Sequence, residues 1–257
     1  DNAIKEPSRE YNKIGVYSDG YYKQINENIL QIENEYYSTV RPKPNPAIKS
    51  RPSKALKKGG VNYIELRSID NNIYSNTGID LEQMYFIELM IIFSLIKSDD
   101  EISDKEYLEI KSNLTNVAHN GRNKKFHLKI SGKDIQISEV LENNLKYLKD
   151  IGNFMFKVTN DKKYKECVEK QEMKIKDNSK IPSNIVINSM TKDKISFYEY
   201  CMKNIWKQKK YFNSIDIDKN FIKKLELEKI KSLKDKRMLE ENTEESYEEY
   251  IKKYFLD

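Results

Sequence analysis

The spacing of hydrophobic and polar positions divides the chain near residue 80. Before that point, short runs alternate between apolar and polar side chains, which is typical of β-strands. Residues 1–13 are polar and irregular, and residues 41–60 hold four of the six prolines, so we expect a long, rigid loop there. We predict strands at residues 13–17, 21–24, 29–40 and 61–70.

After residue 80, apolar residues recur every three or four positions, which favours helices. Asp80 is expected to cap a helix that runs through Lys97. Its predicted inner stripe consists of Phe86, Leu89, Met90, Phe93 and Ile96. A hairpin is predicted at 125–137, and further helices at about 103–117, 138–158, 162–177, 183–192, 195–213, 219–241 and 244–255. Strands followed by helices predict the α+β class, with one region at 1–80 and a helical one at 81–257.

The predicted strand 61–70 places an acid and a guanidinium on one face. Tyr63, Glu65 and Arg67 share that face, because side chains alternate along a strand, while Ile64 and Leu66 share the other. We expect the apolar face to be buried. The polar face is either a cross-strand ion pair or a site for a divalent cation and a phosphoryl group. Spacing alone leaves both interpretations open.

Two sequence blocks resemble the signature of the proteobacterial glutamate–cysteine ligases. The first block is residues 59–72, which read GGVNYIELRSIDNN. The second lies upstream at residues 30–43 and contains LQIENEYY followed by VRPK. The order and separation of the two blocks also agree with that family, and weaker similarity runs through the helical remainder.

The resemblance implies an activity and roles for particular residues. The family joins the γ-carboxylate of L-glutamate to the amine of L-cysteine through a γ-glutamyl phosphate, using ATP with Mg²⁺ or Mn²⁺. Glu65 matches its metal-ligating glutamate, and Arg67 matches its catalytic, phosphate-facing arginine. Tyr37 matches a tyrosine of the cysteine pocket, although a half-buried tyrosine on a sheet is the alternative. Asn34 and Arg41 are further candidate contacts for nucleotide or substrate.

The resemblance also implies a fold and a partner. The family has a curved antiparallel sheet related to that of glutamine synthetase, and this chain resembles its last strands and the helices behind them. The chain begins with Asp rather than Met, so we expect it to be the C-terminal half of a longer enzyme. The remaining metal ligands would lie in the N-terminal half. We therefore predict that the chain alone is inactive.

Departures from the family pattern leave alternatives open. Where the family has N-P-F-S-P-I-G, residues 72–78 read NIYSNTG, so we expect a less constrained loop after the catalytic strand. A related ligase with a different amine acceptor would keep the same fold. A drifted relic without activity would keep it too.

Composition excludes some functions. The 46 basic and 41 acidic residues, with a formal net charge of +5, are mixed along the chain and show no nucleic-acid motif, so we expect no nucleic-acid partner. The most apolar run, 84–96, contains Glu88 and is shorter than the ~20 residues that span a bilayer, so we expect no membrane segment. Cys167 and Cys201 lack metal or CxxC spacing and are interpreted as thiols in a reducing cytoplasm.

Overall fold

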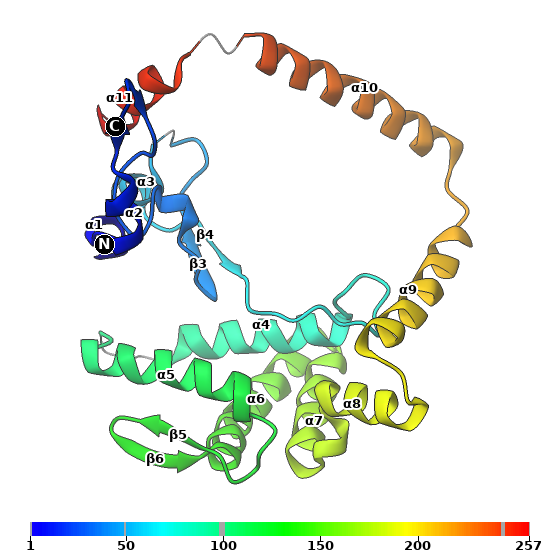
Figure 1. Cartoon of the computed structure of the whole chain (residues 1–257). Helices are drawn as coiled ribbons and strands as arrows, with labels where there is room; N and C mark the ends of the chain where they lie inside the picture. The colour runs from blue at the N-terminus through cyan, green and yellow to red at the C-terminus, as the bar shows by residue number, and fades with distance from the viewer. Residues whose placement is uncertain (1, 49, 98–100, 243–244, 257) are drawn as a thin grey trace. The chain divides into compact units, whose positions relative to one another are not determined.

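The computed structural model describes residues 2–48, 50–97, 101–242 and 245–256 (Figure 1). The chain divides into two compact units, one formed by residues 1–70 with 216–257 and the other by 71–215. This division differs from the predicted regions 1–80 and 81–257, because the last residues group with the N-terminal strands. The predicted boundary at residue 80 stays a prediction.

The first unit combines several short helices and one long helix, α10 (Lys219–Glu241), with two small antiparallel sheets. Strand β3 (Val40–Lys43) pairs antiparallel with β4 (Tyr63–Leu66), and this pair carries the candidate site. The other elements are α1 (Asn2–Lys5), α2 (Arg9–Ile14), β1 (Tyr17–Ser18), β2 (Tyr21–Tyr22), the 3₁₀ turn η1 (Glu33–Glu35), α3 (Pro52–Gly59) and α11 (Tyr247–Leu256).

The predicted strand at 29–40 is wrong, because this segment forms η1 and irregular backbone, and a strand begins only at Val40. Its polar side chains bond to nearby backbone instead of leaving the backbone free for a sheet. The Gln31 side-chain oxygen accepts hydrogen bonds from the backbone N–H groups of Ile25 (2.9 Å) and Asn26 (3.2 Å). Glu35 in turn accepts a bond of 2.7 Å from the Gln31 N–H.

The segment 41–60 is not the long loop that its prolines predict, because it contains the helix α3. Pro52 occupies the first turn, where its missing N–H has no intrahelical partner to lose. The helix start is capped from a distance by Glu33, which accepts bonds of 2.7 Å from both the N–H and the hydroxyl of Ser53. Ala55 then packs inward and is 1% exposed.

The second unit follows the predicted helical pattern closely. The hairpin of β5 (His127–Ile130) and β6 (Lys133–Gln136) turns at Ser131 and Gly132 as expected. The α+β class is confirmed, with a mostly helical chain and small antiparallel sheets. The helices are α4 (Leu81–Ile96), α5 (Asp104–Asn120), α6 (Ile137–Thr159), α7 (Lys163–Lys176), the 3₁₀ turn η2 (Asn178–Lys180), α8 (Pro182–Asp193) and α9 (Phe197–Asn213).

The core of this unit lies where α4, α6 and α7 meet. The predicted stripe of α4 is correct for Leu89, which is fully buried, and for Phe86 and Phe93, which pack against the core. It is wrong for Met90 and Ile96, which are 41% and 69% exposed, so the buried face of α4 is narrower and shorter than the predicted stripe. The core consists of Leu89, Leu145, Leu148, Tyr164, Cys167 and Val168.

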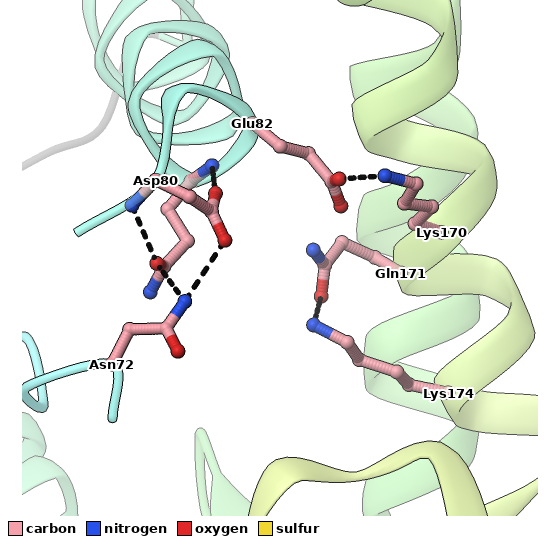
Figure 2. Close-up of polar contacts among 7 residues, drawn as sticks. Asn72, Asp80, Glu82, Lys170, Gln171 and Lys174 are labelled. Carbon is pink, nitrogen blue, oxygen red and sulfur yellow. Dashed lines mark hydrogen bonds and ion pairs between the residues drawn. The ribbon is translucent and has the colours of Figure 1, made fainter. Parts of the chain in front are cut away.

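The predicted cap of α4 is confirmed and belongs to a larger polar network (Figure 2). Asp80 accepts a bond of 2.7 Å from the Gln83 N–H, and the Gln83 side chain accepts one of 3.0 Å from the Asp80 N–H. Asn72 donates to both side chains, at 2.9 and 2.7 Å. Beside this cap, Glu82 of α4 forms an ion pair with Lys170 of α7.

The loop at 72–78 is held by hydrogen bonds. The Asn72 N–H donates to the Gly78 carbonyl at 2.7 Å and closes the turn. The amide of Gln208, on α9, donates to the carbonyls of Ile73 (3.2 Å) and Ser75 (3.0 Å). These hydrogen bonds constrain the loop at 72–78, which lacks the two prolines of the family pattern.

Both cysteines are free thiols, as expected. Burial raises the pKa of the Cys167 thiol to about 11, so this thiol is inert packing. Within the described ranges, no helix combines the length and the apolar character needed to cross a membrane.

Candidate functional site

The centre of the candidate site is a paired carboxylate and guanidinium at the end of β4. The Arg67 Nε and Nη2 atoms donate to one carboxylate oxygen of Glu65, at 3.0 and 2.7 Å. The backbone fixes this geometry, because the Arg67 N–H donates to the Thr39 carbonyl at 2.8 Å and prolongs the β3–β4 pairing by one step. The sequence prediction that Glu65 and Arg67 lie together is therefore confirmed.

The partner strand β3 adds two more cations to the same face. Arg41 lies directly opposite Glu65, and Lys43 lies opposite Tyr63. The Lys43 Nζ atom is 3.1 Å from the second Glu65 oxygen. Cross-strand neighbours share a face, so Arg41, Lys43 and Arg67 lie on the same face as a single acid and leave a net positive charge there.

This cluster is partly shielded from solvent. The side chains of Arg67, Lys43 and Glu65 are 24%, 27% and 30% exposed. The hydrogen bond from Arg67, and then the one from Lys43, hold the pKa of the Glu65 carboxyl below its ordinary value. Glu65 is therefore an anion near neutral pH and cannot act as a proton donor there.

The opposite face of this two-stranded sheet is less buried than expected. Val40 and Ile64 on that face are 45% and 46% exposed. The prediction that β4 is a buried strand is wrong, because in the described structure it pairs with β3 alone. The curved sheet that the resemblance implies stays an expectation.

Tyr37 joins the cluster through Arg67. The guanidinium carbon lies 5.0 Å from the centre of the Tyr37 ring, which is within the range of a cation–π contact. The Tyr37 side chain is 80% exposed, so it is not the half-buried sheet tyrosine of the alternative interpretation. The structure thus brings three predicted residues together, in a chain of contacts from Tyr37 to Arg67 to Glu65.

Asn34 and Arg41 also lie near each other, but their contact uses the backbone. The Arg41 Nη1 atom is 3.5 Å from the carbonyl oxygen of Asn34, at the limit of a hydrogen bond. Arg41 is therefore placed by the β3–β4 register, and Asn34 by the turn η1.

Sequence reasoning missed Lys43 as a site residue. Its position in the block VRPK was visible, but its distance from Glu65 depends on the register of β3 against β4. The spacing of two residues between Arg41 and Lys43 could have identified Lys43, because residues two apart on a strand point to the same face.

A divalent metal does not fit these residues by themselves. Among the residues that the structure describes, no three His, Cys, Asp or Glu side chains gather as a metal site. Both Glu65 oxygens already accept bonds from cations, and Mg²⁺ requires several oxygen ligands. Glu65 would supply at most one such ligand.

Comparison with known proteins agrees with the sequence motifs. Residues 1–117 match the family model of glutamate–cysteine ligase. The glutamate–cysteine ligase of Alcanivorax borkumensis is 30% identical over 261 residues, which cover 100% of this chain and 50% of that protein. A crystal structure of the Francisella tularensis enzyme in complex with AMP matches with a TM-score of 0.87 at 28% identity, over 99% of this chain and 50% of that one.

This chain is a relative of the glutamate–cysteine ligases. A third example, the glutamate–cysteine ligase of Leptospira interrogans, is 32% identical over 230 residues, which cover 90% of this chain and 44% of that protein. The chain thus spans about half the length of the curated ligases it matches. The resemblance read from the two motif blocks is confirmed.

Proposed function

We propose that this chain is one half, the C-terminal one, of an ATP-dependent glutamate–cysteine ligase that catalyses the first step of glutathione synthesis. In this reaction the γ-carboxylate of L-glutamate attacks the terminal phosphorus of ATP, and ADP leaves. The amine of L-cysteine then attacks the γ-glutamyl phosphate, releasing phosphate and forming the amide. The match to ligases over the entire chain, with Glu65 and Arg67 side by side, carries the proposal.

The positive face of β3 and β4 suits the phosphoryl chemistry. In the proposal, Arg67 stabilises the charge on the phosphoryl oxygens during transfer, because its planar fork can bond two oxygens at once. Two of its nitrogens are already fixed on Glu65, which holds the guanidinium in one orientation. Lys43 and Arg41 add positive charge for the nucleotide phosphates, and the AMP bound to the Francisella tularensis relative supports nucleotide use.

Glu65 and Tyr37 take complementary parts in the proposal. Glu65 would contribute one ligand to Mg²⁺ or Mn²⁺, and the N-terminal half would supply the others. Bound metal would neutralise the phosphates of ATP. Tyr37 offers cysteine an exposed phenol, whose ring would contact the thiol side chain and whose hydroxyl would bond its carboxylate. Asn34 stays a candidate contact, and a cytoplasmic location follows only from the resemblance.

The experiment joins the 257 residues to the remaining half of the Leptospira interrogans ligase, as a single chimeric chain. Formation of γ-glutamylcysteine and ADP is measured with ATP, glutamate and cysteine, and with each omitted in turn. The proposal expects one dipeptide for each ADP, and no product from the 257 residues alone. A folded chimera without turnover would contradict it, provided that the intact Leptospira enzyme is active in parallel.

A second assay separates cysteine from another amine acceptor. In the same chimera, Tyr37→Ala should raise the KM for cysteine while leaving the KM for glutamate and ATP within about twofold, because cysteine is the one substrate that the ring contacts in the proposal. Lys57→Ala is the matched control, since Lys57 is an exposed residue on α3 outside the cluster. Equal changes for all three substrates would contradict the assignment of Tyr37.

A further inference from the structure

The second unit contains a cavity that the proposed ligase chemistry does not use. Its volume is about 250 Å³, and it lies among α4, α6, α7 and the segments that follow α5 and α7. No residue of the Glu65 cluster lines it. The lining residues are Phe86, Gly121, Lys124, Ile137, Ser138, Leu141, Leu145, Gln171, Lys174, Ile175, Asn178 and Ile181.

The wall of the cavity is mainly apolar and continuous with the core. Ile137, Leu141 and Leu145 lie four residues apart and therefore form one stripe along α6. Leu145 is 6% exposed and belongs to the core cluster, against which Phe86 also packs. The cavity thus borders the core and opens to solvent, where Leu141 is 44% exposed. An apolar cavity of about 150 Å³ is enough to bind benzene, so this one can take a larger apolar group.

Two ammonium groups give the cavity its charge. The Lys174 Nζ atom donates to the Gln171 side-chain oxygen at 3.1 Å, as Figure 2 shows on α7. The Lys124 Nζ atom donates to the carbonyl of Lys176 at 3.0 Å. An ammonium has three donors, so both side chains can still bond an anion.

Within the part of the chain that the structure describes, no carboxylate pairs with Lys174. The cavity lining contains no Asp or Glu, and among the described residues neither lysine lies within ion-pair distance of a carboxylate. The pKa of Asp177 is lowered mainly by hydrogen bonds from Ser179, and the nearby charge of Lys124 adds a smaller contribution. Lys174 is therefore the better partner for an incoming anion.

We propose that this cavity binds a small monocarboxylate with an apolar body. The body would lie along Leu141 and Leu145, and the carboxylate would accept a bond from Lys174. A charged head with an apolar tail matches the distribution of charge in the wall, whereas a nucleotide would bury polar groups against the apolar stripe. This inference is independent of the ligase activity.

The test compares 4-phenylbutyrate with its neutral amide, using calorimetry on the 257-residue chain. The carboxylate should bind about tenfold more tightly than the amide, since a charge-assisted hydrogen bond is the difference between them. Lys174→Met should remove most of that difference, since Lys174 is the better partner of the two lysines, and leave the affinity for the amide unchanged. Lys157→Met is the control, because Lys157 is exposed on α6 and does not line the cavity.

A second variant tests the location without changing charge. Leu141→Trp should fill the cavity and abolish binding of both compounds, while circular dichroism shows an unchanged helix content. Equal affinities of the wild-type chain for carboxylate and amide would overturn the role of Lys174. Failure of the wild-type chain to bind either compound at millimolar concentration, or binding that survives Leu141→Trp, would overturn the site.

Discussion

Gly152 is a buried residue of α6 that lies against α7, and its replacement by alanine tests the packing directly. A β-carbon at this position would lie 2.7 Å from the carbonyl oxygen of Tyr164 and 3.5 Å from a methyl carbon of Leu89. The oxygen belongs to the backbone of α7, so it cannot rotate away. Accommodating the methyl group requires α7 to move relative to α6.

Two opposing effects decide whether Gly152→Ala raises or lowers the free energy of unfolding. Alanine is favoured over glycine inside a helix by about 1 kcal/mol. Overpacking a well-packed core costs about 1 to 3 kcal/mol, and a contact with fixed backbone belongs at the upper end. We therefore expect Gly152→Ala to lower the free energy of unfolding of this unit by about 1 to 2 kcal/mol.

Urea unfolding followed by tryptophan fluorescence measures this change. Trp206 is the only tryptophan and belongs to the same unit, so its signal reports on that unit. The urea concentration at the midpoint of unfolding should fall by roughly 0.5 to 1 M. The dependence of the free energy of unfolding on urea concentration should stay unchanged. Lys157→Ala, at an exposed position on α6, should stay within about 0.5 kcal/mol of wild type. A Gly152→Ala chain as stable as wild type would refute the reasoning.

Two further predictions concern the first unit. Lys43→Ala should raise the pKa of the Glu65 carboxyl toward its ordinary value, which side-chain carbon NMR against pH would detect; an unchanged pKa would contradict the contact. Because the folded-state pKa of Glu65 is lowered, the stability it contributes is present above its ordinary pKa and is lost as pH falls through the lowered value. Glu33→Ala should destabilise the start of α3 by about 1 kcal/mol and speed hydrogen exchange at the Ser53 amide, whereas Glu33→Gln should retain part of the protection. Equal exchange in all three chains would argue against the cap.

The helices were predictable because their signals are local. α4 is capped by Asp80, and this aspartate and the glutamine three residues later form a capping box that can be recognised in the sequence. The α6 and α7 ranges followed from apolar residues at helical spacing. The exposure of Ile96 was not predictable, since periodicity shows the direction of a side chain but not whether another element covers it.

The strands were less predictable because their pattern competes with local hydrogen bonds. Residues 29–40 alternate like a strand, yet the side chains of Gln31 and Glu35 bond to nearby backbone and favour an irregular path. Pro52 suggested a loop but instead begins a helix, a position that proline favours.

The candidate site was predicted in part. Glu65 and Arg67 are two residues apart on one strand, so their proximity followed from strand geometry and their roles from the resemblance. Lys43 required the register of a second strand, and register is a tertiary property. The stacking of Arg67 on Tyr37 likewise depends on the path of residues 33–40, which the sequence pattern misrepresented.

The most direct test of the account is the effect of Arg67 on phosphoryl transfer. In the chimera with the Leptospira interrogans half, glutamate-dependent formation of ADP is measured in a single turnover for Arg67→Ala, Arg67→Lys and the Lys57→Ala control. We predict that Arg67→Ala lowers the rate by at least about a hundredfold, and that lysine restores little of it, because a lysine cannot reproduce the planar fork. An Arg67→Ala rate within a few fold of wild type would contradict the central claim that this cluster serves phosphoryl transfer.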